Sequence, residues 1–298
     1  MIMKICTFGT LRLDIHMYKD EVDFKNYNEI KVDDMMIAMG GSVFNTASVL
    51  NEMEQDVFFY MLNLSDTLSE YFKLEMNKRD LNYIVCKSDK NRMPISLIFV
   101  DKNGKKKMIS YDGVREDRGI LNKLENHIRE YDLFYSSFYE INQYNYLQLS
   151  HIMELSKKSF LDLSPLIYKH DSSIIDRILK QTDIISGTED EFGILVSKIG
   201  ISDIIQLINR FNFEYLFLKK GSNGASLIKN NRKIDYQSSK MQLSHDTTGC
   251  GDTFNACVIH SLATGVNNEH LILQNAVEMA TMVAYNGFNL DLFKRYHS

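Results

Sequence analysis

The chain has 298 residues, of which 44% are hydrophobic and 24% are charged, and its formal net charge at pH 7 is -5. This length suits one full-sized domain, with or without a small appendage, and the mild acidity argues against a nucleic-acid partner, which needs a basic face. The four cysteines form no Cys-x-x-Cys pair and no run approaches about 20 apolar residues, so the sequence predicts a cytoplasmic protein with reduced thiols and no membrane partner.

The first part of the chain predicts strands separated by one helix. Residues 4–8 and 57–61 are short apolar runs typical of buried strands. Between them, the pair Gly40-Gly41 precedes an apolar-faced helix over residues 43–53, and Ser42 is its expected N-cap.

Two β-rich segments, about residues 13–39 and 94–112, do not fit an alternation of strands and helices. In the second segment, the expected strands 95–100 and 106–111 flank Asn103-Gly104, a dipeptide typical of hairpin turns. We expect the two segments to form a small sheet that projects from the main domain as a lid.

Strands and helices alternate from residue 133 onward. The expected strands are residues 133–135, 159–163, 184–186 and 215–218, and the expected helices are residues 144–157, 173–179, 189–197, 202–211, 251–264 and 269–285. Such alternation predicts parallel strands with crossover helices, and hence a layered α/β fold over a single domain of residues 1–298. Ligands of such sheets bind beyond the carboxyl ends of the strands, which here lie under the lid.

Residues 246–252, with the sequence Asp-Thr-Thr-Gly-Cys-Gly-Asp, carry the clearest chemistry. Gly249 and Gly251 allow close approach of the backbone to a ligand, and the amides at the start of the following helix favour phosphate. Asp252 repels a phosphate, but its presence is explained if it takes a proton from an attacking hydroxyl. For an isolated Gly-x-Gly-Asp, a carboxylate that only favours the helix dipole is the simpler alternative.

Residues 246–254 closely resemble the carboxyl-terminal signature of the ribokinase (PfkB) family of carbohydrate kinases. Residues 40–47 resemble the glycine-pair motif of that family, Asp14 matches its early sugar-binding aspartate, and residues 219–224 resemble its nucleotide loop. The resemblance covers essentially the whole chain. It implies a ribokinase-like layered α/β domain with a mainly parallel sheet and a β-sheet lid. It also implies ATP-dependent phosphorylation of a hydroxyl, preferably primary, on a small hexose, ketose or fructosamine.

The resemblance implies a role for each matching residue. Asp252 is the implied catalytic base, and the amides of Gly249, Cys250 and Gly251 form the implied anion hole. Cys250 stands where the family has a smaller residue, which leaves its amide unaffected. The residues implied at the acceptor are Asp14, Gly40, Gly41 and Asn45, of which Gly40 serves the turn more than the sugar.

The implied nucleotide and metal residues lie in the second half of the chain. The residues implied at ATP are Thr188, Lys219, Gly221, Asn223 and Gly224. Glu191 is implied to organise Mg²⁺ through water, whereas Asp246 and Thr248 match positions of a monovalent-cation site, for which K⁺ is the candidate. Thr188 replaces the asparagine of the family's Asn-x-x-Glu motif, so magnesium organisation can differ here.

Two other functions stay open. The Gly-Gly-Ser-x-x-Asn-Thr form of the glycine pair also occurs among nucleoside kinases of the superfamily. The change at Thr188 leaves open a degenerate sugar- or nucleotide-binding sensor, although Asp252 argues for catalysis. A dehydrogenase is disfavoured, because residues 9–12 lack the repeated glycines of a dinucleotide site. The expected partners are a sugar-like acceptor, ATP and a second copy of the chain through the lid edges. Sugar-phosphate kinases of the family carry a basic residue at the position of Ser42, so Ser42 favours an unphosphorylated acceptor.

Overall fold

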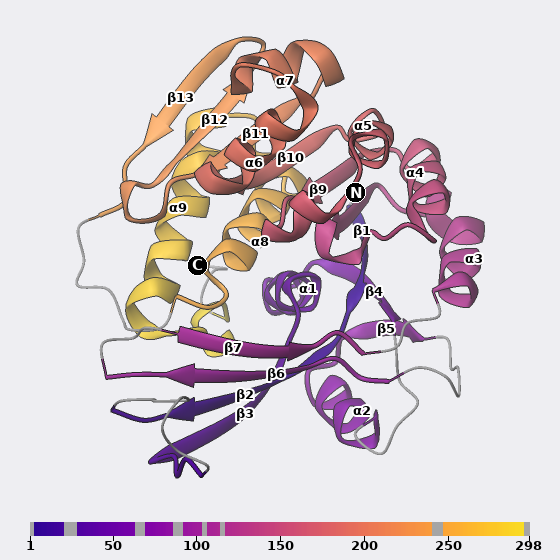
Figure 1. The fold of residues 1–298 in the computed structure, drawn as a ribbon. Helices are drawn as coiled ribbons and strands as arrows, with labels where there is room; N and C mark the ends of the chain where they lie inside the picture. The colour runs from indigo at the N-terminus through magenta and orange to yellow at the C-terminus, as the bar shows by residue number, and fades with distance from the viewer. Residues whose placement is uncertain are drawn as a thin grey trace.

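A nine-stranded sheet forms the centre of the computed structural model, which describes residues 3–20, 29–62, 69–85, 92–102, 106–113, 117–239 and 247–294. The strand order is β13-β12-β11-β10-β9-β8-β1-β4-β5. The strands are β1 (Lys4–Thr10), β4 (Asp56–Leu62), β5 (Asn82–Val85), β8 (Leu133–Ser137), β9 (Ser159–Asp162), β10 (Ile184–Thr188), β11 (Tyr215–Lys219), β12 (Ala225–Lys229) and β13 (Arg232–Tyr236). Strands from β11 to β5 are parallel, and β12 and β13 are antiparallel. This mainly parallel sheet confirms the predicted fold class (Figure 1).

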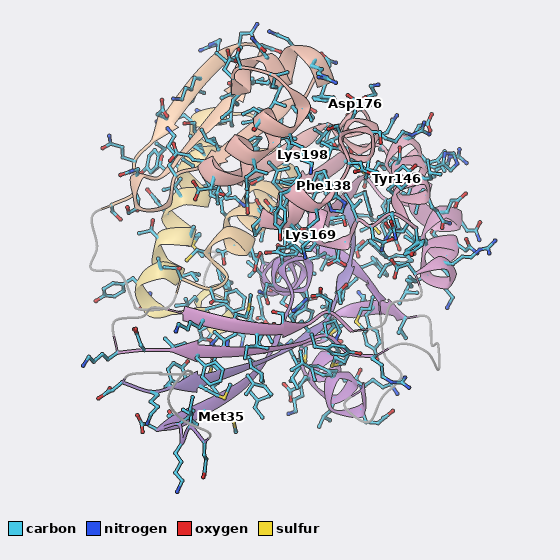
Figure 2. All side chains as sticks on the ribbon, in the orientation of Figure 1. Met35, Phe138, Tyr146, Lys169, Asp176 and Lys198 are labelled. Carbon is cyan, nitrogen blue, oxygen red and sulfur yellow. The ribbon has the colours of Figure 1, made fainter. Side chains whose placement is uncertain are left out.

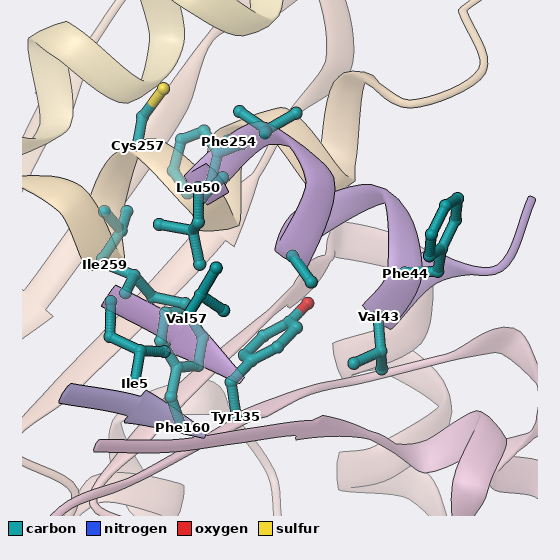
Figure 3. Packing of buried hydrophobic residues seen from close by; sticks show 14 of the residues in the cluster. Ile5, Val43, Phe44, Leu50, Val57, Tyr135, Phe160, Phe254, Cys257 and Ile259 are labelled. Carbon is teal, nitrogen blue, oxygen red and sulfur yellow. The ribbon is translucent and has the colours of Figure 1, made fainter. Parts of the chain in front are cut away.

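Helices cover both faces of this sheet, which explains why its inner strands are apolar on both sides. One face carries α1 (Ser42–Glu52), α2 (Ser69–Lys78), α8 (Cys250–Ala263) and α9 (Glu269–Asn286), and the other carries α3 (Arg118–His127), α4 (Tyr146–Leu155), α5 (Ser172–Leu179), α6 (Glu189–Ile199) and α7 (Ile204–Phe211). On β1, Ile5 packs in the first core, whereas Cys6 and Phe8 pack in the second. Figure 3 shows the first core, in which Leu50 of α1 and Phe254 of α8 pack together.

A second sheet of four strands lies at the end of the molecule nearest β1 and α1 (Figure 1). Its strand order is β3-β2-β6-β7, with β2 (Arg12–Tyr18), β3 (Asp34–Gly40), β6 (Ile95–Val100) and β7 (Lys106–Tyr111). The two strands expected over residues 95–111 are confirmed, whereas the turn Asn103-Gly104 lies outside the described residues. Only Leu11 separates β1 from β2, and β3 ends just before α1, so this sheet adjoins the carboxyl end of β1. Its action as a lid stays a prediction.

The prediction that Ser42 caps α1 was wrong. The N-cap is Gly41, with φ 116° and no side-chain cap, and Ser42 is the first helical residue. The hydroxyl of Ser42 instead donates a hydrogen bond to Asp252, 210 residues along the chain. A short polar residue before an apolar helix therefore served a tertiary contact rather than the helix end.

The alternating elements expected after residue 133 are confirmed within a few residues of their predicted bounds. The sequence did not predict α2, β5, α3, β12 or β13. No helix within the described ranges is long and apolar enough to cross a bilayer. Cys6, Cys250 and Cys257 are free thiols.

Candidate active site

The start of α8 is shaped by a glycine. Gly249 has φ 81°, in the left-handed region that favours glycine, and a Cβ there would lie 2.3 Å from the ring of Phe288. The first turn of a helix leaves amide N–H groups without partners inside the helix, and these attract anions. The predicted anion hole, formed by the amides of Gly249, Cys250 and Gly251, lies at the amino end of a 14-residue helix, where the Cys250 amide donates to the Thr247 carbonyl at 3.3 Å.

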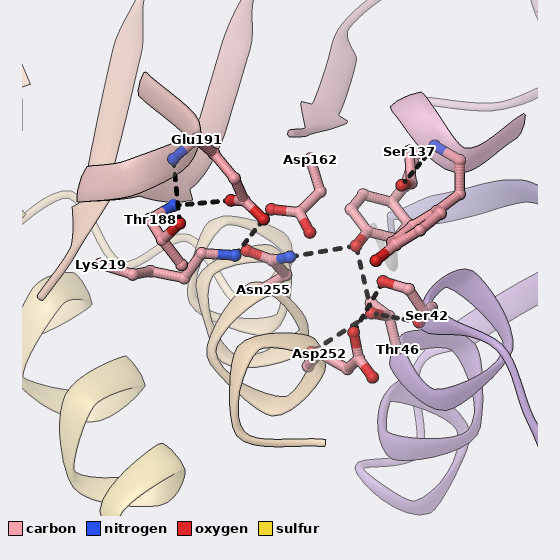
Figure 4. Close-up of polar contacts among 11 residues, drawn as sticks. Ser42, Thr46, Ser137, Asp162, Thr188, Glu191, Lys219, Asp252 and Asn255 are labelled. Atoms are coloured by element: carbon pink, nitrogen blue, oxygen red, sulfur yellow. Dashed lines mark hydrogen bonds and ion pairs between the residues drawn. The ribbon is translucent and has the colours of Figure 1, made fainter. Parts of the chain in front are cut away.

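Asp252 lies in the first turn of α8 and is held by α1 (Figure 4). Ser42 Oγ donates to Asp252 Oδ1 at 2.7 Å, and Asn45 Nδ2 donates to Asp252 Oδ2 at 2.8 Å. Burial raises the pKa of Asp252 to about 6, although these two hydrogen bonds and the charge of Lys219 lower it. A carboxylate with this pKa is ionised near neutral pH and can still accept a proton in a reaction.

A buried tyrosine ties these two helices to the sheet. Thr46 of α1 donates to the Tyr135 hydroxyl at 3.2 Å, and Asn255 of α8 donates to the same oxygen at 3.1 Å. Thr46 Oγ1 also lies 3.3 Å from the backbone oxygen of Asp252. Because Tyr135 lies in β8, this network holds α8, which carries Asp252, against α1, which carries Ser42 and Asn45.

Asp14 and the glycine pair meet at the junction of the two sheets. A Cβ on Gly40 would lie 1.8 Å from Asp14 Oδ2, and a Cβ on Gly41 would lie 2.3 Å from the carbonyl oxygen of Thr10. At Gly41 the backbone itself excludes a side chain, whereas at Gly40 a side chain would fit only if the Asp14 carboxylate moved. Burial raises the pKa of Asp14, partly offset by a hydrogen bond with Ser96. Asp14 Oδ1 is buried and has no hydrogen-bond partner within the described part of the chain, so it can accept a bond from a bound ligand.

Three charged side chains gather at the carboxyl ends of β9, β10 and β11. Lys219 Nζ is 2.7 Å from Asp162 Oδ1, and the two side chains are 12% and 8% exposed. Thr188 and Glu191 form a capping box at the start of α6: Glu191 Oε2 accepts from the Thr188 amide at 2.8 Å, and Thr188 Oγ1 accepts from the Glu191 amide at 3.3 Å. Burial and the nearby Asp162 carboxylate raise the pKa of Glu191.

The predicted nucleotide loop follows directly after Lys219. Gly221 to Asn223 form a 3₁₀ turn, and the Lys220 amide donates to the Gly224 carbonyl at 2.8 Å. Gly224 has φ 82°, and a Cβ there would lie 2.0 Å from the carbonyl oxygen of Tyr236. The loop therefore has a defined shape, and it lies at the same sheet edge as the charged cluster.

The predicted cation site is described only in part. Thr248 lies in the turn before α8, whereas Asp246 falls outside the described residues. Within the residues that are described, no group of three or more His, Cys, Asp or Glu side chains is placed to hold a metal. The monovalent-cation site thus stays a prediction.

Comparison with known proteins identifies the family. The sequence model of the pfkB family carbohydrate kinases matches residues 3–287. The chain belongs to this family. As a pfkB-family protein it is a sugar or nucleoside kinase. No curated protein matches it in sequence.

Solved structures share the fold of this pfkB kinase at low identity. A mutant phosphofructokinase-2 from Escherichia coli is 12% identical with a TM-score of 0.80, covering 99% of each chain. Ribokinase from Thermotoga maritima is 20% identical with a TM-score of 0.78, covering 97% of this chain and 95% of its own. A nucleoside kinase from Methanocaldococcus jannaschii is 15% identical with a TM-score of 0.78, covering 95% and 92%.

Residues from distant motifs of this pfkB kinase thus converge on one edge of the sheet. Asn45 contacts Asp252, and Lys219 reaches the start of α8. Sequence reasoning missed Asp162 and Tyr135 as site residues. The position of Asp162 at the end of a predicted strand was a usable signal, whereas Tyr135 looked like any other apolar residue of a buried strand.

Proposed function

We propose that this kinase transfers the γ-phosphoryl group of ATP to a primary hydroxyl of a small sugar or sugar derivative, such as a hexose, ketose or fructosamine. One observation carries the proposal: Asp252, with a pKa of about 6, lies directly after the first amides of α8, to which we assign the phosphate. A proton acceptor and a phosphate site are therefore adjacent, as in-line phosphoryl transfer to a hydroxyl requires.

The proposed reaction is a single displacement. Asp252 takes the proton of the acceptor hydroxyl, and the oxygen forms a bond to the γ-phosphorus. The bond from that phosphorus to the β-phosphate oxygen breaks, and its electron pair leaves on ADP. The amides of Gly249, Cys250 and Gly251 stabilise charge on the transferred group, and donors of this kind are each worth about 3–4 kcal/mol of barrier.

The acceptor is proposed to lie between the two sheets. Asp14 has a buried, unpartnered oxygen within the described residues, which suits a hydroxyl donor from the sugar. Asn45 has its amide nitrogen on Asp252, so its oxygen and the Asp252 carboxylate can orient the same hydroxyl. Gly40 lets the Asp14 carboxylate lie against the backbone at this junction, where a Cβ would lie 1.8 Å from Asp14 Oδ2.

The residues at the strand ends fit ATP and Mg²⁺. Mg²⁺ is commonly held by one or two carboxylates with phosphate oxygens and waters, and Glu191 is a carboxylate of this kind. When bound, Mg²⁺ supplies charge neutralisation at the phosphates. Thr188 contributes by capping α6 and thereby fixing Glu191. Asp246 and Thr248 are proposed to hold K⁺.

A nucleoside is the second candidate acceptor. Nucleoside kinases from Methanocaldococcus jannaschii and from Burkholderia thailandensis, the latter in complex with inosine, cover 95% and 98% of this chain. A screen for ATP- and Mg²⁺-dependent ADP release over sugars and nucleosides separates the candidates. Turnover of one class assigns the acceptor. Ligand binding without turnover on every member would instead indicate the non-catalytic sensor.

The acid side of the pH profile is an expected result of this mechanism. Asp252 acts as a base only when ionised, so kcat/KM should fall about tenfold per pH unit as the pH drops below about 6. Above about pH 7, Asp252 should impose no further change. The titratable groups that interact with it are Asp162, Lys219, Tyr135 and Tyr139. Kinetics between about pH 5 and pH 8 measure this limb, and a rate independent of pH in that range contradicts the role of Asp252.

We infer that a second copy of the chain covers the outer edges of the small sheet. Its edge strands are β3 and β7. They expose Met35, Met36, Ile37, Met108, Ile109 and Tyr111, each at least 47% accessible. Figure 2 shows Met35 at the outer end of the small sheet. Apolar strand edges of this kind are normally covered by another chain or protected by charge.

The dimer is tested by light scattering after size-exclusion chromatography. The wild type should have the mass of two chains, and a variant with both Ile37→Lys and Ile109→Lys should have the mass of one. Both side chains are about half exposed, so the fold should tolerate lysine there. A wild type that is monomeric at every concentration contradicts the inference.

A further inference from the structure

A buried lysine lies between the start of α8 and the carboxylates at the ends of β9 and β10. Lys219 is the last residue of β11, and its side chain is 12% exposed. Its Nζ is 2.7 Å from Asp162 Oδ1 on β9, and its charge also interacts with Glu191 of α6 and Asp252 of α8. The ammonium group thus lies beside the carboxylates of Asp162 and Glu191, which come from two different elements (Figure 4).

The same ammonium group lies against the start of α8. A Cβ built on Gly251 would lie 3.5 Å from Lys219 Nζ. Apart from its chain neighbours and the backbone of its own helix, no other atom of the described residues would lie within 4 Å of that Cβ. Gly251 has ordinary helical dihedrals, so its backbone does not demand a glycine. The space over Gly251 is therefore open and bordered by a fixed positive charge.

The ion pair with Asp162 does not by itself account for this lysine. Burying an ammonium group with a carboxylate costs desolvation that an apolar pair at the same place would avoid. A positive charge held beside helix-start amides is instead suited to an oxyanion, and fixed cations of this kind speed phosphoryl transfer. Burial lowers the pKa of Lys219, but Asp162 and Glu191 more than compensate, so the pKa ends above its usual value and the group stays protonated.

We propose that Lys219 is a catalytic residue whose ammonium group binds a non-bridging oxygen of the transferred phosphoryl group beside the Gly251 amide, and that Asp162 is the residue that positions it. The inference rests on the proposed function. Lys219 keeps its protons throughout: the acceptor proton goes to Asp252, the new bond joins the acceptor oxygen to phosphorus, and the electron pair of the broken bond leaves on ADP.

Lys219→Met is the direct test. Its kcat should fall about 10²- to 10³-fold, while the acceptor KM stays within about threefold, because the lost contact matters mainly in the transition state. Lys219→Arg should recover part of the loss. The acid limb of kcat/KM should move to higher pH in Lys219→Met, because the lysine charge lowers the pKa of Asp252. Lys158→Met is the matched control. Lys158 directly precedes β9 and forms an ion pair with Glu214, and its loss should leave kcat unchanged.

A binding measurement tests the same contact without turnover. Aluminium fluoride bound with ADP mimics a transferring phosphoryl group. Mg²⁺, ADP and aluminium fluoride together should therefore raise the melting temperature of the wild type more than Mg²⁺ and ADP alone do. Lys219→Met should lose this increment and keep the ADP shift. Asp162→Asn should lose part of it. If Lys219→Met does not fold, the double variant Asp162→Asn, Lys219→Met removes both charges and should show the same losses.

Retained turnover or a retained aluminium fluoride increment in the lysine variants overturns the assignment of Lys219 and leaves the kinase function standing. A wild type that neither turns over any acceptor nor responds to ADP overturns the proposed function itself. The two failures are therefore distinguishable.

Discussion

Asp252→Asn is expected to reduce kcat about 10³- to 10⁴-fold, which corresponds to about 4–5 kcal/mol of transition-state stabilisation. An amide cannot take the proton of the acceptor hydroxyl. The fold should nevertheless persist, because the amide oxygen can accept from Asn45 and the amide nitrogen can donate to the Ser42 hydroxyl, replacing both hydrogen bonds of the carboxylate. Steady-state kinetics with the acceptor found in the screen measure the loss.

Stability provides an internal check on this variant. The pKa of Asp252 is raised in the folded protein, so its contribution to stability is present at low pH and is lost as the pH rises through about 6. Asparagine removes the cost of the buried charge, and the melting temperature at about pH 8 should equal or exceed that of the wild type.

The matched control is Asp176→Asn. Asp176 lies on α5, away from the small sheet (Figure 2), where it pairs with Arg210 and Lys180. Asp176→Asn should leave kcat unchanged, because Asp176 lies away from the site. It should also leave the fold intact, because surface ion pairs contribute little to stability. Turnover of Asp252→Asn within about tenfold of the wild type would show that another group removes the proton.

The inner part of the fold could be predicted because burial leaves a direct mark on the sequence. The strands β8 to β11 are short apolar runs, since helices cover both of their faces. In contrast, β13 is largely exposed and has no such run. The helix α3 buries Ile120, Leu121 and Leu124 in an otherwise polar segment, and this stripe is too narrow to stand out.

The contacts of the site could not be predicted, because they depend on strand order. Asp162 and Lys219 are 57 residues apart, and they meet only because β10 alone separates β9 from β11. The hydrophobic pattern that predicts each strand contains no information about its neighbours. The partners of Asp252 were likewise hidden, since Ser42 fits a helix cap as well as it fits a tertiary hydrogen bond.

Thr188 illustrates how a departure from a family motif can be interpreted physically. The sequence suggested an altered magnesium site, because threonine reaches less far than asparagine. In the structure, the Thr188 hydroxyl accepts from the Glu191 amide, and the Glu191 carboxylate accepts from the Thr188 amide. Threonine is a good N-cap, so it holds the start of α6 in place while the carboxylates of Glu191 and Asp162 stay near Lys219.

Gly40→Ala is expected to raise the KM for the acceptor about 10²-fold and to leave ATP binding unchanged. The alanine methyl group would lie 1.8 Å from Asp14 Oδ2, so the carboxylate must move from the place where we propose that it binds acceptor hydroxyls. Loss of hydrogen bonds to a charged group costs about 1.5–3 kcal/mol, or about 10- to 150-fold in binding. Kinetics at saturating ATP with varied acceptor measure the change.

The same substitution at Gly193 is the control, because a Cβ there meets nothing within 4 Å and helix α6 gains a better helix former, so KM should not change. Asp14→Ala supplies the second arm of a double-mutant cycle. If Gly40→Ala acts by displacing Asp14, the double variant should bind the acceptor no worse than Asp14→Ala alone. Fully additive losses would mean that the two residues act on the acceptor independently, and that Gly40 matters to the site for some reason other than the room that it leaves for the aspartate.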